Sequence, residues 1–268
     1  MIKTNRQLPI FVFVGLAFTL ANAAAATRYV SLANPNPTTP FTNWATAATN
    51  IQQAVDVAVA GELVLVTNGI YQSGGSGGSR VNVAKPIVVQ SVNGPMSTVI
   101  KGYQLPLTTN GVGAMRCVYL SQNASLIGFT LTGGATETNS TLGYGGGVAC
   151  RAPGAVVSNC VVVGNAAVYG GGIYSGPGIY SSATNYNCVF SNNVAQDSGG
   201  GGYAGTYNSC LFIGNAAAYG GAVSTYSSGQ VALNNCTIFG NKALLRGGGI
   251  YGVSLSGRAD VKMNNCII

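Results

Sequence analysis

The sequence predicts an all-β solenoid, in which short strands wind into one column of stacked parallel coils behind a short N-terminal helix. Three observations predict it. In the clear repeats of residues 128–268, a Cys recurs at spacings of 28, 22, 26 and 30 residues, and an Asn stands five residues after it in each complete copy. A Gly cluster and an apolar or aromatic residue then follow. The intervening runs are β-branched and aromatic without helical periodicity, which indicates short strands and tight corners.

Residues 1–26 are predicted to be a signal peptide. Lys3 and Arg6 form a basic start, residues 8–20 form an apolar run, and cleavage is expected after Ala23 or Ala26. The alternative is a membrane anchor, but the run is shorter than the roughly 20 residues that span a bilayer, and no later segment could span one. We therefore expect an exported protein, secreted or at the cell surface or outer membrane, whose residues 27–268 form a single β-helix domain.

A short helix is expected near residues 50–60. Thr49-Asn50-Ile51-Gln52 resembles a capping box, and Gly61 is expected to stop the helix. Its apolar face would consist of Ile51, Ala54, Val55 and Ala58. Such a helix can plug the open N-terminal end of a solenoid and hide its unpaired edge. The first strands are expected at residues 62–67, 81–83, 87–90, 97–100 and 116–120, with a flexible loop at residues 74–79.

Stacked coils pair in parallel about 4.8 Å apart, so equivalent residues are expected to form columns along the solenoid. One inward column holds Phe129, Cys160, Cys188, Cys210, Cys236 and Cys266, and a second holds Leu131, Val162, Phe190, Phe212, Ile238 and Ile268. A corner ladder is expected from Asn165, Asn193, Asn215 and Asn241, because Asn tolerates left-handed backbone and stacked amides hydrogen-bond between coils. The Gly clusters allow positive φ and close backbone approach at the next corner.

Two features suggest contacts with other molecules. Alternation along the strands places an apolar stripe outward, formed by Val161, Val163, Val189, Leu211, Ile213 and Phe239, which suggests lateral packing against a partner or a covering loop. The chain also stops at Ile268, inside a strand, before the Asn corner and the Gly cluster that follow elsewhere. We expect this chain to be the N-terminal part of a longer protein, or to self-associate through an uncapped C-terminal end.

The seven cysteines are expected to be buried thiols that act as small hydrophobes. Disulfides are the alternative in an exported chain, and Cys117 and Cys150, which lie off the column, are the pair best suited to form one. Neighbours within the column point the same way, which suits the disulfide dihedral poorly, and no pair has zinc-like spacing.

Composition excludes several kinds of chemistry. The chain has no His, which excludes His-dependent nucleophiles, bases and metal sites. Its carboxylates are few and scattered: Asp56, Glu62, Glu137, Asp197 and Asp260. The Lys and Arg residues are not clustered as they are in nucleic-acid-binding proteins. We expect no cofactor, no metal and no nucleic-acid partner, and the basic balance favours acidic surfaces or polysaccharides.

The repeat signatures resemble those of a known superfamily. Gly220-Gly221-Ala222-Val223 and Phe190-Ser191-Asn192-Asn193 are close to the Gly-Gly-Ala-Ile and Phe-x-x-Asn signatures of bacterial secreted β-helix proteins and polymorphic outer-membrane proteins. The resemblance implies a right-handed parallel β-helix of the pectin-lyase-like superfamily. It covers most of the chain after residue 26, most strongly residues 128–268, and it is specific for fold and weak for activity.

Two main functions are expected, and a carbohydrate-binding module or a passenger segment of a larger protein is the third alternative. The first is a non-catalytic secreted or cell-surface protein with an adhesive, structural or glycan-binding role. The alternative is a polysaccharide lyase or glycoside hydrolase acting on acidic polysaccharide, because enzymes of the superfamily often combine Ca²⁺ on clustered Asp with an Arg or Lys base. The comparable set here is Asp197, Lys242 and Arg246, expected in turns two coils apart. One carboxylate makes a poor Ca²⁺ site, so ordinary turn charges are the preferred interpretation.

Tyrosines flank the Gly clusters. Tyr174, Tyr203 and Tyr251 follow theirs, and further tyrosines, Tyr144, Tyr169 and Tyr219, precede theirs or lie within them. We expect the first three to point outward and to offer a flat amphipathic strip for the sugar rings of a polysaccharide or cell-surface glycan. The alternative is ladder packing that stiffens the coil.

Overall fold

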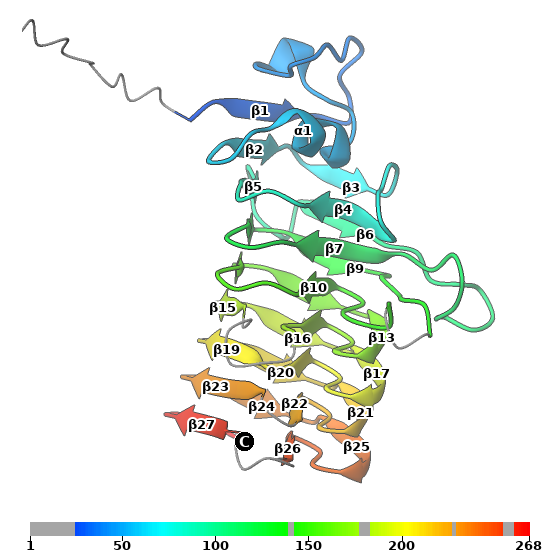
Figure 1. The fold of residues 1–268 in the computed structure, drawn as a ribbon, viewed down its shortest axis with the longest axis vertical. Coiled ribbons are helices and arrows are strands. Elements are labelled where there is room, and N and C mark those ends of the chain that lie inside the picture. The colour runs from blue at the N-terminus through cyan, green and yellow to red at the C-terminus, as the bar shows by residue number, and fades with distance from the viewer. Residues whose placement is uncertain (1–24, 139–141, 177–182, 227–228, 254–259) are drawn as a thin grey trace, which may run out of the picture.

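The computed structural model describes residues 25–138, 142–176, 183–226, 229–253 and 260–268, which form one elongated column of stacked coils (Figure 1). The predicted signal peptide lies, apart from its last two residues, outside the described residues and stays a prediction. The strands assemble into four parallel sheets that run along the column. The predicted fold class, an all-β right-handed parallel β-helix with an N-terminal capping helix, is confirmed.

We name the four sheets A to D. Sheet A has the order β1 (Thr27–Val30), β2 (Leu63–Val66), β5 (Val88–Ser91), β8 (Ser125–Ile127), β11 (Val156–Ser158), β15 (Thr184–Tyr186), β19 (Gly205–Asn208), β23 (Gln230–Asn234) and β27 (Asp260–Asn264). Sheet B has the order β3 (Gly69–Tyr71), β6 (Thr98–Lys101), β9 (Thr130–Thr132), β12 (Val161–Val163), β16 (Val189–Ser191), β20 (Leu211–Ile213) and β24 (Thr237–Phe239).

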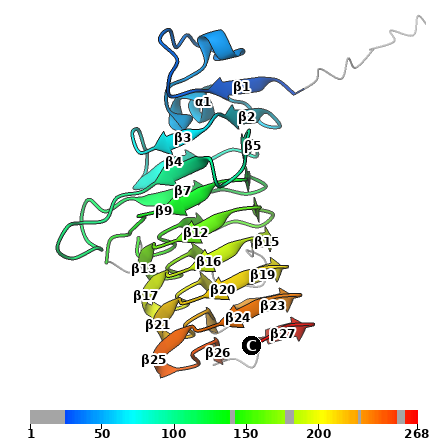
Figure 2. The same cartoon turned by 180° about the vertical axis from the view of Figure 1, so that it is seen from behind.

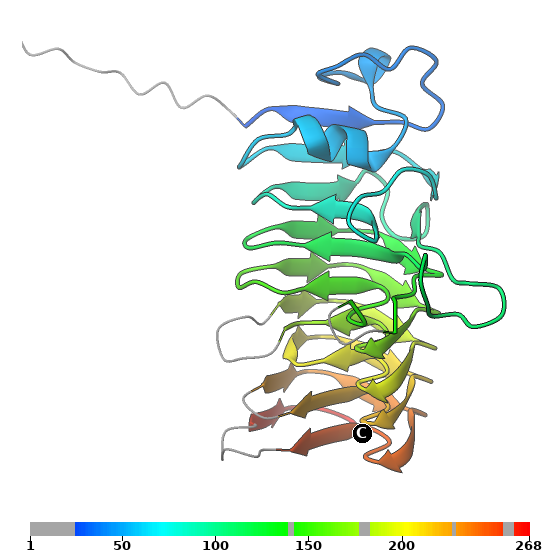
Figure 3. The ribbon, with the colours of Figure 1, turned by 45° about the vertical axis from the view of Figure 1, so that its right-hand side comes forward.

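Sheets C and D complete each coil. Sheet C has the order β4 (Ser79–Val83), β7 (Arg116–Leu120), β10 (Val148–Cys150), β14 (Ile173–Tyr174), β18 (Gly202–Tyr203), β22 (Val223–Tyr226) and β26 (Ile250–Val253). Sheet D has the order β13 (Ala166–Tyr169), β17 (Val194–Ser198), β21 (Ala216–Tyr219) and β25 (Lys242–Arg246). From β11 onward the chain visits the sheets in the order A, B, D and C in every coil, and Figure 3 turns the side with sheet D toward the viewer.

The helix α1 (Ile51–Val57) lies at the N-terminal end of the column, after a 3₁₀ turn η1 (Trp44–Thr46). The Asn50 side chain accepts a hydrogen bond from the Gln53 backbone N–H at 3.0 Å, which caps the first turn. The predicted apolar face is buried, and α1 contacts β1, β2 and β4. The helix thereby covers the first coil, as predicted.

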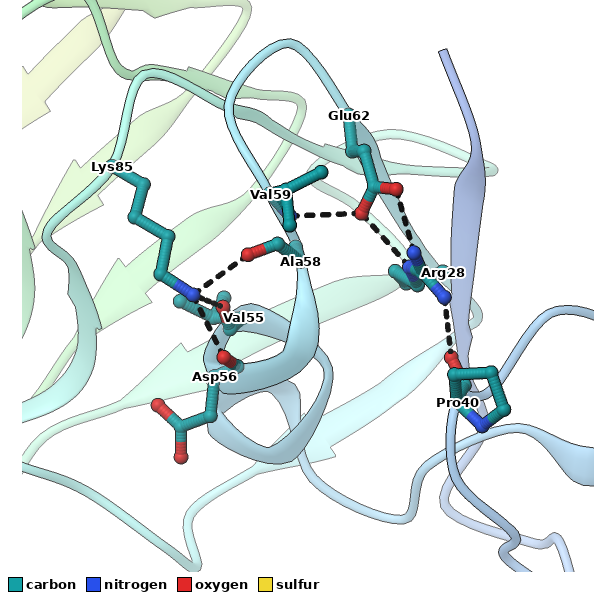
Figure 4. Close-up of polar contacts among 8 residues, drawn as sticks. All are labelled: Arg28, Pro40, Val55, Asp56, Ala58, Val59, Glu62 and Lys85. Atoms are coloured by element: carbon teal, nitrogen blue, oxygen red, sulfur yellow. Dashed lines mark hydrogen bonds and ion pairs between the residues drawn. The ribbon is translucent and has the colours of Figure 1, made fainter.

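The helix ends before the predicted position. Its last residue is Val57, whereas Gly61, with φ of 86°, lies in the turn that leads to β2. The Lys85 ammonium donates to the backbone carbonyls of Val55, Asp56 and Ala58 at 3.2, 2.7 and 2.7 Å (Figure 4). A lysine from a later coil therefore satisfies carbonyls at the helix end, where the helix dipole also favours a positive charge.

An ion pair ties the first strand to the second coil. The Arg28 guanidinium donates to both carboxylate oxygens of Glu62, at 2.9 and 2.6 Å, and to the Pro40 carbonyl oxygen at 3.1 Å (Figure 4). Glu62 also accepts from the Val59 backbone N–H at 2.9 Å. The hydrogen bond from Arg28 holds the pKa of Glu62 below its usual range, against the opposing effect of burial.

We expect acid to weaken this contact. Because the pKa of Glu62 is lowered in the folded chain, its stabilisation is present above the unfolded value of about 4.3 and is lost as the pH falls through the folded pKa. Glu62→Gln should lower the free energy of unfolding by about 2 kcal/mol at pH 7 and by less at pH 3. Urea unfolding at both pH values measures this, with exposed Asp260→Asn as the control. An equal loss at both pH values would contradict the account.

The interior columns lie where the repeats predict them. The two inward columns are buried, except that Cys266 is half-buried and Ile268 is exposed in the last described coil. The prediction that Ile268 is buried is therefore wrong, because no described strand packs beyond it. Phe190 and Phe212 stack with their ring centroids 4.9 Å apart, which illustrates the coil-to-coil repeat.

The predicted Asn ladder is present, but its backbone conformation was wrongly predicted. Asn193 donates from Nδ2 to Asn215 Oδ1 at 3.0 Å, and equivalent bonds join Asn165 to Asn193 and Asn215 to Asn241. The left-handed residues are the preceding ones, Gly164, Asn192, Gly214 and Gly240, with φ between 53° and 66°. Turning the chain one residue earlier leaves each ladder side chain pointing inward, where it can reach the next coil.

A second set of left-handed corners was not predicted. The residue directly before each column Cys has φ of 50° to 54°: Asn159, Asn187, Ser209, Asn235 and Asn265. The signal was an Asn or Ser at this position in every copy, residue types that adopt this conformation or turn more readily than most. The flexible loop predicted at residues 74–79 ends before Ser79, because Ser79 is buried and is the first residue of β4.

All seven thiols are free, so Cys117 and Cys150 are not paired. Six are buried, as predicted for small hydrophobes, and burial raises the pKa of Cys117 and of Cys150 to about 12. The predicted apolar stripe lies in register on the outer side of sheet B, whose strands follow one another in Figure 2. Its Ile213 and Phe239 are exposed. Packing of a partner there stays a prediction, as does self-association through the C-terminal end.

Candidate functional site: a tyrosine cleft between sheets C and D

Two rows of outward residues flank the Gly corner that joins sheet D to sheet C. Strand pairing aligns the sheet D row as Tyr144, Tyr169, Ser198, Tyr219 and Arg246. It aligns the sheet C row as Ala149, Tyr174, Tyr203, Ser224 and Tyr251. In several coils, a tyrosine in one row lies beside a small residue in the other row. The rings of the two rows therefore interdigitate.

The Gly cluster makes this corner concave. Its first glycine has positive φ in each copy, for example 64° at Gly170 and 73° at Gly199, as predicted. Its second glycine packs against the backbone of the next coil: a Cβ on Gly200 would lie 2.5 Å from the carbonyl oxygens of both Ala216 and Gly221. Only a residue without a side chain allows this close approach, so the chain folds back sharply between the two rows.

The corner encloses a cleft with a volume of about 580 Å³. Tyrosine dominates its wall, which consists of Tyr144, Tyr169, Tyr174, Asp197, Ser198, Tyr203, Tyr219, Tyr226 and Tyr251. We call this the tyrosine cleft. It follows the long axis of the column, because its walls come from successive coils of sheets C and D.

The rings pack into a pre-formed surface. Tyr174 stacks on Tyr203 at 5.1 Å between ring centroids, and Tyr144 lies 4.4 Å from Tyr174. Further along, Tyr219 stacks on Tyr251 at 5.0 Å. Rings at these separations stabilise one another in offset and tilted arrangements, so the wall needs little ordering when a ligand binds.

Burial keeps the phenols of Tyr169, Tyr174 and Tyr203 in the neutral form. It is the main cause that raises the pKa of Tyr203 to about 12 and raises the pKa of Tyr174 further, and neighbouring tyrosines add to both shifts. Burial also raises the pKa of Tyr169, with a smaller contribution from Asp197. A protonated phenol donates and accepts hydrogen bonds, but it does not remove a proton from a substrate near neutral pH.

The structure brings the three predicted ligand-binding tyrosines into this one cleft but corrects their setting. Tyr174 and Tyr203 are only 3% and 8% exposed, so they do not form the flat outward strip that was expected. They form the floor of a recess, because the sheet D tyrosines stand beside them. Tyr226 and Ser198 were not predicted as site residues. Tyr226 lies outside the repeated Gly motif, and Ser198 belongs to the cleft only because the coils stack.

The three charged residues predicted as a weak catalytic set do not lie together. Asp197 lies on β17 and lines the cleft, whereas Lys242 and Arg246 are exposed on β25, two strands away in sheet D. These residues lie in strands and not in the turns expected for them, because sheet D fills the segment between the Asn ladder and the Gly cluster. In the described part of the chain, no ion pair joins Asp197 to either cation. Their catalytic role stays untested.

The described residues contain no group of three or more His, Cys, Asp or Glu side chains that could hold a metal ion. They also contain no helix of the length and hydropathy needed to cross a bilayer.

Comparisons with known proteins add little to this geometry. No protein-family profile matches the chain, and neither does any curated protein sequence. Among solved structures, the chain is similar to rice weevil pectin methyl esterase, with a TM-score of 0.41 and 11% sequence identity over 77% of this chain. The chain spans 63% of that structure's length.

Proposed function

We propose that this chain is a non-catalytic secreted or cell-surface β-helix protein that binds an extended polysaccharide in the tyrosine cleft. The observation that carries the proposal is the pair of in-register outward rows, whose six tyrosines line one cleft along the column together with Tyr226. Tyrosine offers an apolar face and a hydrogen-bonding tip, the combination that suits a sugar ring with its apolar face and peripheral hydroxyls.

The dimensions of the fold support a linear ligand. Coils repeat about every 4.8 Å, so rings recur along the cleft and can contact successive units of a chain laid parallel to the column. The neutral phenols supply donors and acceptors for hydroxyl groups, and Asp197 supplies an acceptor at the wall. The interdigitated rings are already packed, which lowers the entropic cost of binding.

One observation favours the alternative of a polysaccharide lyase or glycoside hydrolase: Asp197 lies in the same cleft as the tyrosines. Against it, the raised pKa values keep Tyr174 and Tyr203 protonated, so neither serves as a base near pH 7. Incubation with polygalacturonate and with alginate separates the two functions. Absorbance from unsaturated products or release of reducing ends would contradict the non-catalytic proposal, and binding without either product supports it.

Replacing an exposed ring of the cleft is expected to weaken polysaccharide binding. Tyr226 is 47% exposed in the cleft, and Tyr186 is 44% exposed on sheet A, so the two make a matched pair. We expect Tyr226→Ala to raise the dissociation constant about fivefold, the equivalent of about 1 kcal/mol for one aromatic contact, and Tyr186→Ala to leave it unchanged. Affinity electrophoresis in gels containing a panel of neutral and acidic polysaccharides measures this. Equal effects of the two substitutions, or no retardation by any polysaccharide, would overturn the proposal.

A further inference from the structure

A second, smaller cavity adjoins the tyrosine cleft at Tyr144, which lines both. It has a volume of about 220 Å³ and lies over β4, β7 and β10 of sheet C. The residues that matter are Asn82, Arg116, Tyr119, Tyr144 and Arg151. We call this the arginine pocket.

Arg116 is unusual because it is a nearly buried cation with an unused donor. It is 7% exposed at the start of β7. Its Nη2 donates to the Leu142 carbonyl oxygen at 2.8 Å, and its Nη1 donates to Ser79 Oγ at 3.4 Å. Its buried Nε–H has no acceptor among the residues that the structure describes. Leaving a buried charged donor unpaired is costly, so such an atom marks a place where a ligand can supply the missing acceptor.

A second guanidinium adds positive charge to the pocket. Arg151 lies over the Tyr144 ring, with its Cζ 5.1 Å from the ring centroid, and it lines the pocket with Arg116. Burial lowers the pKa of Arg116, and the charge of Arg151 lowers it further, whereas Glu137 opposes the shift. Glu137 lines a neighbouring cavity that shares Arg116 with this pocket. The charged side chains that line the arginine pocket itself are Arg116 and Arg151.

The pocket also contains an unused acceptor. Asn82 Oδ1 is buried and receives no hydrogen bond from the described part of the chain. Its backbone is held by Gln52, with the Asn82 N–H donating to Gln52 Oε1 at 2.7 Å, so the side chain is positioned by a distant segment. The pocket thus combines cationic donors with one acceptor, and a matching ligand carries an oxyanion beside a hydroxyl or other donor.

We propose that the arginine pocket binds a compact oxyanion group, a carboxylate or a sulfate, with a hydrogen-bond donor beside it. The guanidinium of Arg116 contributes the buried contact, Arg151 contributes the second charge, and Asn82 accepts from the neighbouring donor. This inference does not rest on the polysaccharide proposal, because small anions alone can occupy the pocket.

Equilibrium dialysis of the full chain with radiolabelled sulfate, acetate or glycolate tests the site. We expect saturable binding of one anion per chain, with glycolate bound more tightly than acetate because its hydroxyl reaches Asn82 Oδ1. Tighter binding of sulfate than of either carboxylate would identify a sulfate site, and the reverse order a carboxylate site. Arg116→Gln and Arg151→Gln should each weaken binding at least tenfold.

The control is Lys262→Gln, which removes the same charge from an exposed position on β27, the last strand of sheet A. It should leave binding unchanged. Arg151 is exposed, so its substitution tests the site even if Arg116→Gln fails to fold. Absence of saturable binding, or equal weakening by Lys262→Gln, would overturn the inference and would leave the proposal for the tyrosine cleft standing.

Discussion

Asn193→Ala is expected to lower the free energy of unfolding by about 4 kcal/mol, one of the two largest effects we predict. The Asn193 side chain is fully buried. Its Nδ2 donates to the Val162 carbonyl oxygen at 2.8 Å and to Asn215 Oδ1 at 3.0 Å, and its Oδ1 accepts from the backbone and side-chain N–H groups of Asn165. Alanine would leave several of these groups buried and unpaired, which costs more than the bonds themselves contribute.

An outer Asn ladder provides the control. Asn234 donates from Nδ2 to Asn208 Oδ1 at 2.9 Å and accepts from Asn264 at 2.8 Å, but it is only half-buried. Water can replace these partners, so Asn234→Ala should cost less than about 1 kcal/mol. Urea unfolding curves of both variants measure the difference. Similar losses would show that burial does not set the strength of the ladder.

Gly200→Ala is expected to destabilise the chain by at least about 3 kcal/mol and to disrupt the tyrosine cleft. The φ of Gly200 is not in the left-handed region, so the effect is steric. The added Cβ would lie 2.5 Å from two backbone oxygens of the next coil. One belongs to Ala216 in β21, and the other to Gly221 in the Gly corner, where it accepts a hydrogen bond from the Gly201 N–H, so neither can move independently. Separating the coils would break hydrogen bonds on both sides of the corner.

The last coil offers a matched substitution for this prediction. Gly248 occupies the equivalent position, but a Cβ there would meet only the Asn241 carbonyl oxygen, at 3.2 Å. Gly248→Ala should therefore change the free energy of unfolding by less than about 1 kcal/mol. Thermal unfolding followed by circular dichroism compares the two variants. A stable Gly200→Ala protein would show that the corner can accept a side chain.

Periodicity made the architecture predictable at the level of single residues. Because equivalent residues of stacked coils lie directly above one another, the repeat identified which side chains form the two inward columns and the inner Asn ladder. The outer ladder that contains Asn234 was not predicted. The backbone at the corners was less predictable. The sequence does not distinguish an Asn that adopts left-handed φ from an Asn whose side chain forms hydrogen bonds inside the column. In this chain Asn192 has left-handed φ, and the neighbouring Asn193 forms the inward hydrogen bonds.

The site was predicted in part for the same reason. The tyrosines beside the Gly clusters could be recognised because they recur with the repeat, and the structure places Tyr174, Tyr203 and Tyr251 in one cleft. Their depth could not be predicted, because it depends on the angle between sheets C and D. Arg116 stands at the start of a predicted strand, but its burial could not be predicted, because the residues that surround it come from other coils and are distant in the sequence.

The sequence by itself determined that this chain is a column of parallel coils, and which residues its interior contains, because a repeat constrains every copy to the same local conformation and the same side-chain direction. The tertiary structure decided where the outward residues meet. The corner between two sheets turns two separate rows of tyrosine into one cleft. The stacking of β4, β7 and β10 brings into one pocket the Arg116 guanidinium, whose Nε–H has no partner among the described residues, a second cation, and the Asn82 amide oxygen, which also has none. Which outward side chains lie close together depends on how the coils pack, and the sequence of a single repeat does not encode it.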